Sequence, residues 1–186
     1  MSAGVTRLTL VSHGMTEAMR AARFPADEPI EQHARGIAAD TAALRGDAVR
    51  IGPEVRAAQT AALLGLSGSV DPALRDLDCG QWAGIAMDAL APAELMAWMS
   101  DPGYRGHGGE SITDVLDRVR GWLDTRAADG QRIVAVTHPA VVRASVLTAL
   151  SAPPESFWRI DIPPLSATAL HGRGTTWTVR HTALPV

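Results

Sequence analysis

Three short apolar runs, each followed by a segment of helical periodicity, constrain the fold of this chain more than any other feature. The runs are Thr6–Ser12, Ala48–Gly52 and Arg132–Thr137. A short continuous apolar run is typical of a strand in a parallel sheet, because helices cover both faces of such a sheet. Strands that alternate with helices therefore predict an α/β three-layer sandwich, in which helices cover both faces of a mainly parallel sheet.

The clearest predicted helix begins after Ser111, where Asp114 completes a variant of the capping box. The apolar residues of Ile112–Leu123 then recur on one helical face. Near the end of the chain, Ser166–His171 and Thr175–His181 predict a β-hairpin. Further helices are predicted over Ile30–Leu44, Val55–Leu66, Met87–Met99 and Pro139–Leu150.

The length and charge of the chain favour one domain that recognises a small molecule. We expect residues 1–186 to form a single domain, since 186 residues of which 46% are hydrophobic can bury one core. The net charge of -3 gives no reason to expect nucleic acid or a membrane surface as a partner. No apolar run approaches the roughly 18 residues that span a bilayer, and Met1 to Thr6 show no secretory signal. A cytoplasmic location is therefore expected.

Absent residue types exclude several kinds of site. All 17 basic residues are arginines, and the chain contains neither lysine nor asparagine. A Walker-type phosphate loop, a Schiff-base lysine and a kinase catalytic asparagine are therefore impossible. Cys79 is the only cysteine, which excludes an internal disulfide and a multi-cysteine metal site.

Residue types that bind phosphate or attack phosphorus follow the predicted strands. His13 comes directly after the first apolar run, His138 after the third, and Arg56 lies in the first turn of the helix after the second. The carboxyl ends of parallel strands meet at one edge of a sheet, where ligands bind. Arginine and helix N-termini bind phosphate oxygens, and a neutral imidazole can attack phosphorus. The spacing alone leaves open whether these residues form a phosphate site or are ordinary surface residues.

Ordered motifs decide between these alternatives. The chain resembles the histidine phosphatase superfamily, whose members are phosphoglycerate mutase-like, in blocks that occur in the order of that family. The blocks are Leu8–Thr16 around His13, Gly52–Ala61 around Arg56, Leu74–Gly84 around Asp76, Gly108–Ser111 followed by Arg118, and Val136–Arg143 around His138.

The resemblance implies a phosphoglycerate mutase-like fold and a role for each motif residue. It implies that His13 is the nucleophile and that Asp76, where the family normally has glutamate, is the general acid and base. It implies that Arg56 and His138 stabilise the phosphoryl oxygens. It implies no metal and no organic cofactor.

The resemblance also implies that the phosphate is contacted by three residues of the first motif, Ser12, Gly14 and Thr16.

The sequence departs from the family pattern at three positions near the expected phosphate. Ser12 replaces the first phosphate-binding arginine, Met19 stands where an asparagine is common, and Pro139 replaces a glycine and lacks an N–H. These changes predict weakened anion binding.

Other residues are candidates to compensate for that loss. Arg20 and Arg143 could supply replacement charge, and His107 could border the substrate mouth, although each also fits a surface or loop position.

The sequence therefore predicts a phosphatase that hydrolyses a small phosphorylated metabolite through a phosphohistidine. The alternatives are a phosphoglycerate mutase-type phosphotransferase and a catalytically weakened or silent relative that binds phosphoesters. A ribazole phosphate is one candidate substrate. A homodimer formed through a sheet edge or tryptophan-bearing helices is compatible with the sequence.

Overall fold

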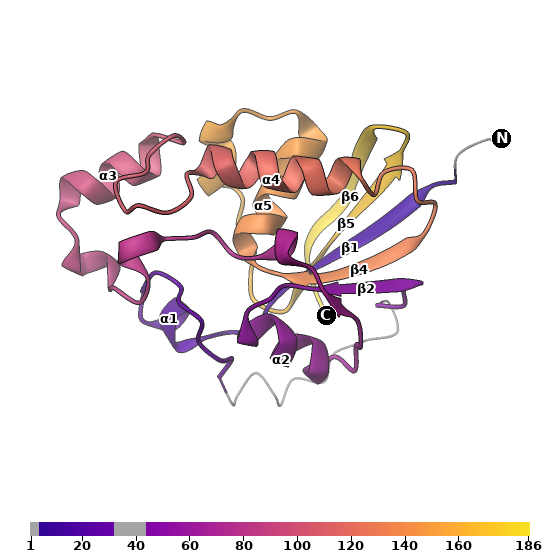
Figure 1. Cartoon of the computed structure of the whole chain (residues 1–186), viewed down its shortest axis with the longest axis horizontal. Coiled ribbons are helices and arrows are strands. Elements are labelled where there is room, and N and C mark those ends of the chain that lie inside the picture. The colour runs from indigo at the N-terminus through magenta and orange to yellow at the C-terminus, as the bar shows by residue number, and fades with distance from the viewer. Residues whose placement is uncertain (1–3, 32–43) are drawn as a thin grey trace.

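The computed structural model describes residues 4–31 and 44–186, which form one six-stranded sheet with helices on both faces (Figure 1). The strands lie in the order β3-β2-β4-β1-β5-β6. Their bounds are β1 Thr6–Ser12, β2 Ala48–Ile51, β3 Ser69–Val70, β4 Arg132–Thr137, β5 Ser166–Arg173 and β6 Thr176–Pro185.

The central strands run parallel, as the sequence predicts. β1 pairs with β4, β4 with β2 and β2 with β3 in parallel register, so that Leu10 lies opposite Ala135. The predicted hairpin is also confirmed, because β5 and β6 pair with each other in antiparallel register. β5 is antiparallel to β1 as well, and the hairpin therefore extends the sheet beyond its parallel part.

Helix α4 carries the clearest local signal and forms as predicted. The Ser111 hydroxyl accepts a hydrogen bond from the backbone N–H of Asp114, and the Asp114 carboxylate accepts one from the backbone N–H of Ser111. This capping box satisfies two N–H groups that the helix itself leaves unpaired. The helices are α1 Glu17–Arg20, α2 Val55–Leu63, α3 Pro92–Ser100, α4 Ile112–Asp124 and α5 Pro139–Leu150.

The prediction of one helix over Met87–Met99 is wrong at its start. Met87–Ala89 form a 3-10 turn, Leu90 and Ala91 are extended, and α3 begins at Pro92. The proline explains the break, because it disfavours helical geometry in the residue before it and has no N–H to donate to a preceding turn.

One other predicted helix is shorter in the structure, and a second cannot be compared over most of its length. α2 ends at Leu63 rather than Leu66, with Gly65 in the left-handed region at a φ of 65°. Residues 32–43 of the predicted helix Ile30–Leu44 lie outside the described residues.

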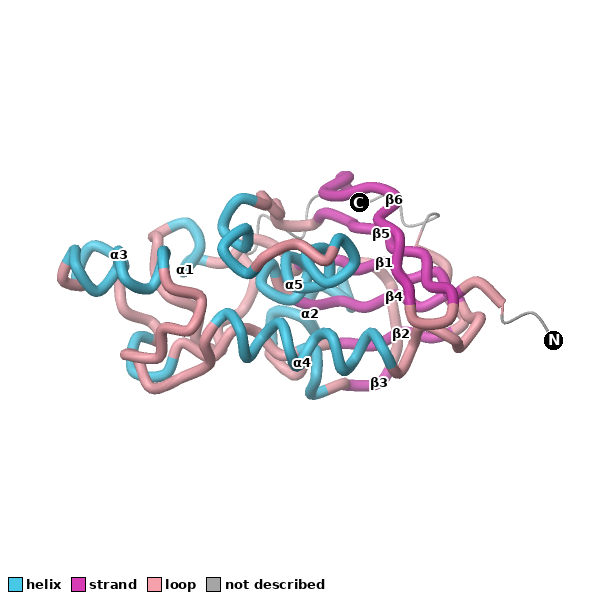
Figure 2. Tube along the Cα trace, turned by 90° about the horizontal axis from the view of Figure 1, so that it is seen from above, coloured by secondary structure: helices cyan, strands magenta, loops and turns pink. Residues whose placement is uncertain are grey.

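The layers follow from the alternation of side chains along β1. Leu8 and Leu10 point to the face covered by α4 and α5, and they belong to the larger apolar core. Val11 points to the opposite face, where it packs in a second core with Ala57 and Ala61 of α2. Figures 1 and 2 show α4 and α5 on one side of the sheet and α2 on the other. The predicted three-layer sandwich is therefore confirmed.

A lobe built from α1, α3 and the turns between β3 and α4 extends past the carboxyl ends of β1 and β4 (Figure 2). An aromatic cluster holds it together: the ring of Phe24 lies 5.1 Å from that of Trp82 and 5.2 Å from that of Trp98. The lobe lies beyond the sheet edge at which β1 and β4 end, next to His13 and His138. Within the described residues, no helix combines the length and apolar character needed to cross a membrane.

Candidate active site

The two histidines predicted at strand ends lie side by side. His13 directly follows β1 and His138 directly follows β4, and these strands are neighbours in the sheet. The backbone N–H of His13 donates to the Thr137 carbonyl at 2.9 Å, and the two imidazole rings lie 5.2 Å apart. Their exposed fractions are 3% and 0%, so both rings are removed from bulk water.

The His13 ring is held in a form that can act as a nucleophile. Its Nδ1 lies 2.7 Å from the Gly14 carbonyl oxygen, which can only accept, so Nδ1 carries the proton. Burial, together with the nearby His138, lowers the pKa of His13 to about 4. A neutral ring with protonated Nδ1 leaves the lone pair on Nε2.

Arg56 and Asp76 form an ion pair beside these rings. Arg56 lies in the first turn of α2 and is 1% exposed, and its Nη2 donates to Asp76 Oδ2 at 2.7 Å. Its Nη1 donates to the Ala26 carbonyl. Its Nε is buried and has no hydrogen-bond partner among the described residues.

Asp76 also faces His138, because its Oδ2 lies 3.5 Å from His138 Nδ1. Burial by itself would raise the pKa of Asp76. The electrostatic effects of His138 and Arg56 outweigh that of burial and hold this pKa below its ordinary range. Asp76 is therefore ionised in the free protein, and the four residues that the motifs single out form one cluster.

Glu54 is a member of this cluster that the sequence analysis missed. Its Oε2 lies 2.7 Å from His138 Nε2, and its Oε1 accepts the backbone N–H of Asp76 at 2.9 Å. Burial would raise the pKa of Glu54, but the hydrogen bond and charge of His138 hold it below its ordinary range. The one available signal was its position after β2, two residues before Arg56.

The predicted phosphate contacts of the first motif surround His13 and bond within the protein. Gly14 N–H donates to the Thr60 hydroxyl at 2.9 Å, and the Thr16 hydroxyl accepts from Met19 N–H at 3.2 Å. The Ser12 hydroxyl is buried and has no hydrogen-bond partner in the described parts of the chain.

The structure places only one of the three residues suggested to compensate for weakened anion binding beside His13. Arg20 is exposed and pairs with Glu31. His107 is buried, accepts a hydrogen bond from Gly109 N–H through Nδ1 at 3.0 Å, and packs against Trp82. Of the three, Arg143 alone lies on the wall of the cavity beside His13.

That cavity has a volume of about 350 Å³. His13 and Asp76 form part of its wall, and residues of the lobe form much of the rest. Cys79 also lines it, but burial raises the pKa of this thiol to about 12, so the thiol remains protonated. The cavity therefore places space for a substrate directly against His13 and Asp76.

A metal ion is a geometric alternative for this cluster. One ligand atom from each of His13, Asp76 and His138 lies within 4.8 Å of the others, which is close enough to share an ion. The guanidinium of Arg56 already neutralises Asp76 at 2.7 Å. A second cation at this carboxylate would meet electrostatic repulsion, whereas a phosphate would be attracted to the same guanidinium.

Comparison with known proteins identifies the family. The model for the histidine phosphatase superfamily (branch 1) matches residues 8–184, and the chain belongs to this superfamily. It is 31% identical over 175 residues to the glucosyl-3-phosphoglycerate phosphatase of Mycolicibacterium vanbaalenii, across 82% of this chain and 78% of that protein. It is also 31% identical over 189 residues to a bifunctional protein of Mycobacterium tuberculosis. That similarity covers 92% of this chain, which spans about half (52%) of that relative.

Solved structures agree with this assignment. The fold is similar to that of a mycobacterial glucosyl-3-phosphoglycerate phosphatase in complex with VO3, with a TM-score of 0.82 and 26% identity over 97% of this chain and 99% of that chain. The predicted family and the predicted class of activity, a phosphatase of small phosphorylated metabolites, are therefore confirmed.

The environment of His13 predicts that its ring stays neutral across the physiological range. In NMR titrations from about pH 8 to about pH 5, its ring resonances should keep the neutral Nδ1–H pattern, because the folded pKa of about 4 lies below this window. His13→Ala identifies the resonances. A midpoint near the ordinary histidine value of about 6.5 would contradict this description of the site.

Proposed function

We propose that this phosphatase acts through a phosphohistidine formed on Nε2 of His13. The observation that carries the proposal is the His13 ring itself, which is buried, neutral, fixed through Nδ1 to the Gly14 carbonyl, and on the cavity wall. Attack by Nε2 on phosphorus splits one hydrolysis into two easier transfers.

Arg56 receives the phosphate in this proposal. Its Nε has no partner among the described residues, and its neighbouring Nη2 is bound to Asp76. Nε and Nη2 form one fork of the guanidinium, the geometry that binds two phosphate oxygens. An incoming phosphate takes the place of Asp76 on this fork.

Displacement from Arg56 prepares Asp76 for proton transfer. The Arg56 charge is one of the interactions that lower the pKa of Asp76, so its loss to phosphate raises that pKa and favours the protonated acid. Asp76 then protonates the leaving oxygen as the P–O bond breaks. In the second step it removes a proton from the water that attacks the phosphohistidine.

Glu54 positions His138 in this mechanism. The ring of His138 has a carboxylate oxygen near each nitrogen, Glu54 Oε2 at Nε2 and Asp76 Oδ2 at Nδ1. Because Glu54 occupies the Nε2 side of the ring, the Nδ1 side becomes available to a phosphoryl oxygen when phosphate displaces Asp76.

The remaining predicted contacts have supporting roles. We propose that Gly14 and Thr16 hold the loop after β1 through their bonds to Thr60 and Met19, and that the unpartnered Ser12 hydroxyl turns toward the phosphate. The homodimer and the cytoplasmic location stay predictions.

Turnover of aryl and sugar phosphates tests the proposed chemistry. We expect the wild type to release inorganic phosphate from p-nitrophenyl phosphate and His13→Ala to lose this activity by several orders of magnitude, since no other group replaces the nucleophile. Preincubation with EDTA should leave the wild-type rate unchanged. Equal rates in wild type and His13→Ala, or complete loss with EDTA, would overturn the mechanism.

Glu54→Gln separates a positioning role from a structural one. At neutral pH we expect kcat/KM to fall about 10- to 100-fold, the effect of losing a charge-assisted hydrogen bond to His138. The free energy of unfolding should change far less than this loss in rate implies, because the substitution keeps the size of the side chain and removes only its charge.

The exposed Glu94→Gln, in α3, is the matched control and should behave like the wild type in both measurements. A loss of stability in Glu54→Gln that accounts for the whole loss in rate would assign Glu54 a purely structural role.

A further inference from the structure

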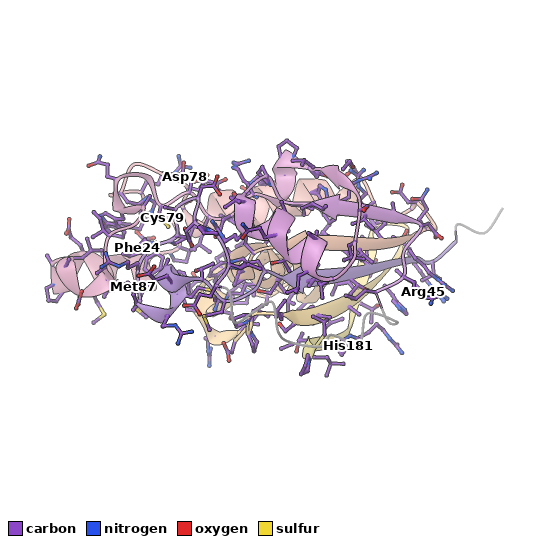
Figure 3. All side chains as sticks on the ribbon, turned by 90° about the horizontal axis from the view of Figure 1, so that it is seen from below. Phe24, Arg45, Asp78, Cys79, Met87 and His181 are labelled. Atoms are coloured by element: carbon purple, nitrogen blue, oxygen red, sulfur yellow. The ribbon has the colours of Figure 1, made fainter. Side chains whose placement is uncertain are left out.

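The wall of the cavity beside His13 is predominantly apolar, although it adjoins a cluster of charged groups. The side chains beyond His13 and Asp76 include thioethers, aromatic rings and an aliphatic group, contributed by Met19, Phe24, Leu77, Met87, Trp98 and Trp158. Figure 3 shows Phe24, Cys79 and Met87 together in the lobe, at the opposite end of the molecule from Arg45.

The charged side chains on this wall are already bonded to the protein. Arg143 donates through Nε to the Ile160 carbonyl at 2.8 Å, and its guanidinium packs 5.5 Å from the ring of Trp158. Arg23 donates to the Gly84 carbonyl at 3.2 Å, and Glu28 accepts from Ala26 N–H at 2.8 Å. Each of these three side chains is therefore held by at least one hydrogen bond to the backbone.

The place of the cavity determines which part of a substrate occupies it. His13 and Asp76 lie on its wall, and Asp76 is the group that we assign to the leaving oxygen. The organic part of the ester begins at that oxygen, so it extends away from the phosphate into the apolar space. A buried hydroxyl without a hydrogen-bond partner is unfavourable, whereas each buried methylene is favourable.

We propose that the substrate is a monophosphate ester with an apolar alkyl or aryl group, and that the cavity selects it over polyhydroxylated sugar esters. This inference rests on the proposed phosphatase chemistry and adds the chemical class of the leaving group. Met19 and Pro139 are both on the cavity wall. From the sequence alone, these two residues indicate weakened anion binding. Each removes a polar group from the space where the apolar group lies.

An alkyl series tests this inference while keeping the leaving chemistry almost constant. With ethyl, propyl, butyl and hexyl phosphates, kcat/KM should rise about fourfold per methylene until the cavity is full. Propyl phosphate should exceed glycerol 1-phosphate about tenfold or more, since the two differ by hydroxyls that lose water against a predominantly apolar wall. Rates that are flat along the series, or higher for glycerol 1-phosphate, would overturn the proposal.

Two methionines provide a matched pair of variants. Met87→Gln places an amide of similar size on the cavity wall and should reduce the preference for hexyl over ethyl phosphate severalfold. Met96→Gln makes the same change at a residue of α3 that is 68% exposed and should leave the preference as in the wild type. An equal effect of both variants would contradict the assignment of the apolar site.

Binding to His13→Ala makes the test independent of turnover. Calorimetric titration of this variant with the same esters should give affinities that rise with chain length and are weaker for glycerol 1-phosphate. If the wild type hydrolyses none of these esters, the proposed function fails, and the affinities still decide what the cavity prefers. Equal affinity for propyl phosphate and glycerol 1-phosphate would overturn the inference even in an active enzyme.

Discussion

The ion pair between Arg56 and Asp76 is the interaction on which the rest of the site depends. It joins the first turn of α2 to the segment before α3, and it lies against His138 at the end of β4. Glu54 completes the arrangement, because one of its oxygens binds the His138 ring and the other binds the Asp76 backbone. Each buried carboxylate of the cluster therefore faces a nitrogen of a neighbouring side chain, Asp76 that of Arg56 and Glu54 that of His138.

The sheet supplies the rigid frame for this cluster. His13 and His138 share one edge because β1 and β4 are parallel neighbours, and the helices that follow them carry the chain away from the site. The lobe of α1 and α3 then closes the space opposite the sheet edge and surrounds it with apolar side chains. Charge stabilisation and leaving-group recognition thus come from different parts of the fold.

Much of this arrangement could be predicted from local sequence. β1, β4, α4 and α5 have continuous apolar runs, a capping box or a proline at the first helical position, and these signals act within a few residues. The contact between Glu54 and His138 could not be predicted, because it joins residues 84 positions apart in the chain. The apolar character of Met19 and Pro139 was visible, but their shared cavity depends on the three-dimensional position of the lobe.

Trapping the phosphorylated protein would show whether His13 carries the phosphoryl group during turnover. The wild type would be mixed rapidly with a phosphomonoester, quenched in alkali and analysed by peptide mass spectrometry. We expect a phosphoryl group on His13 that is stable in alkali and lost in acid, and none on His13→Ala. Rapid release of the alcohol with no protein-bound phosphate, or phosphate on another residue, would contradict it.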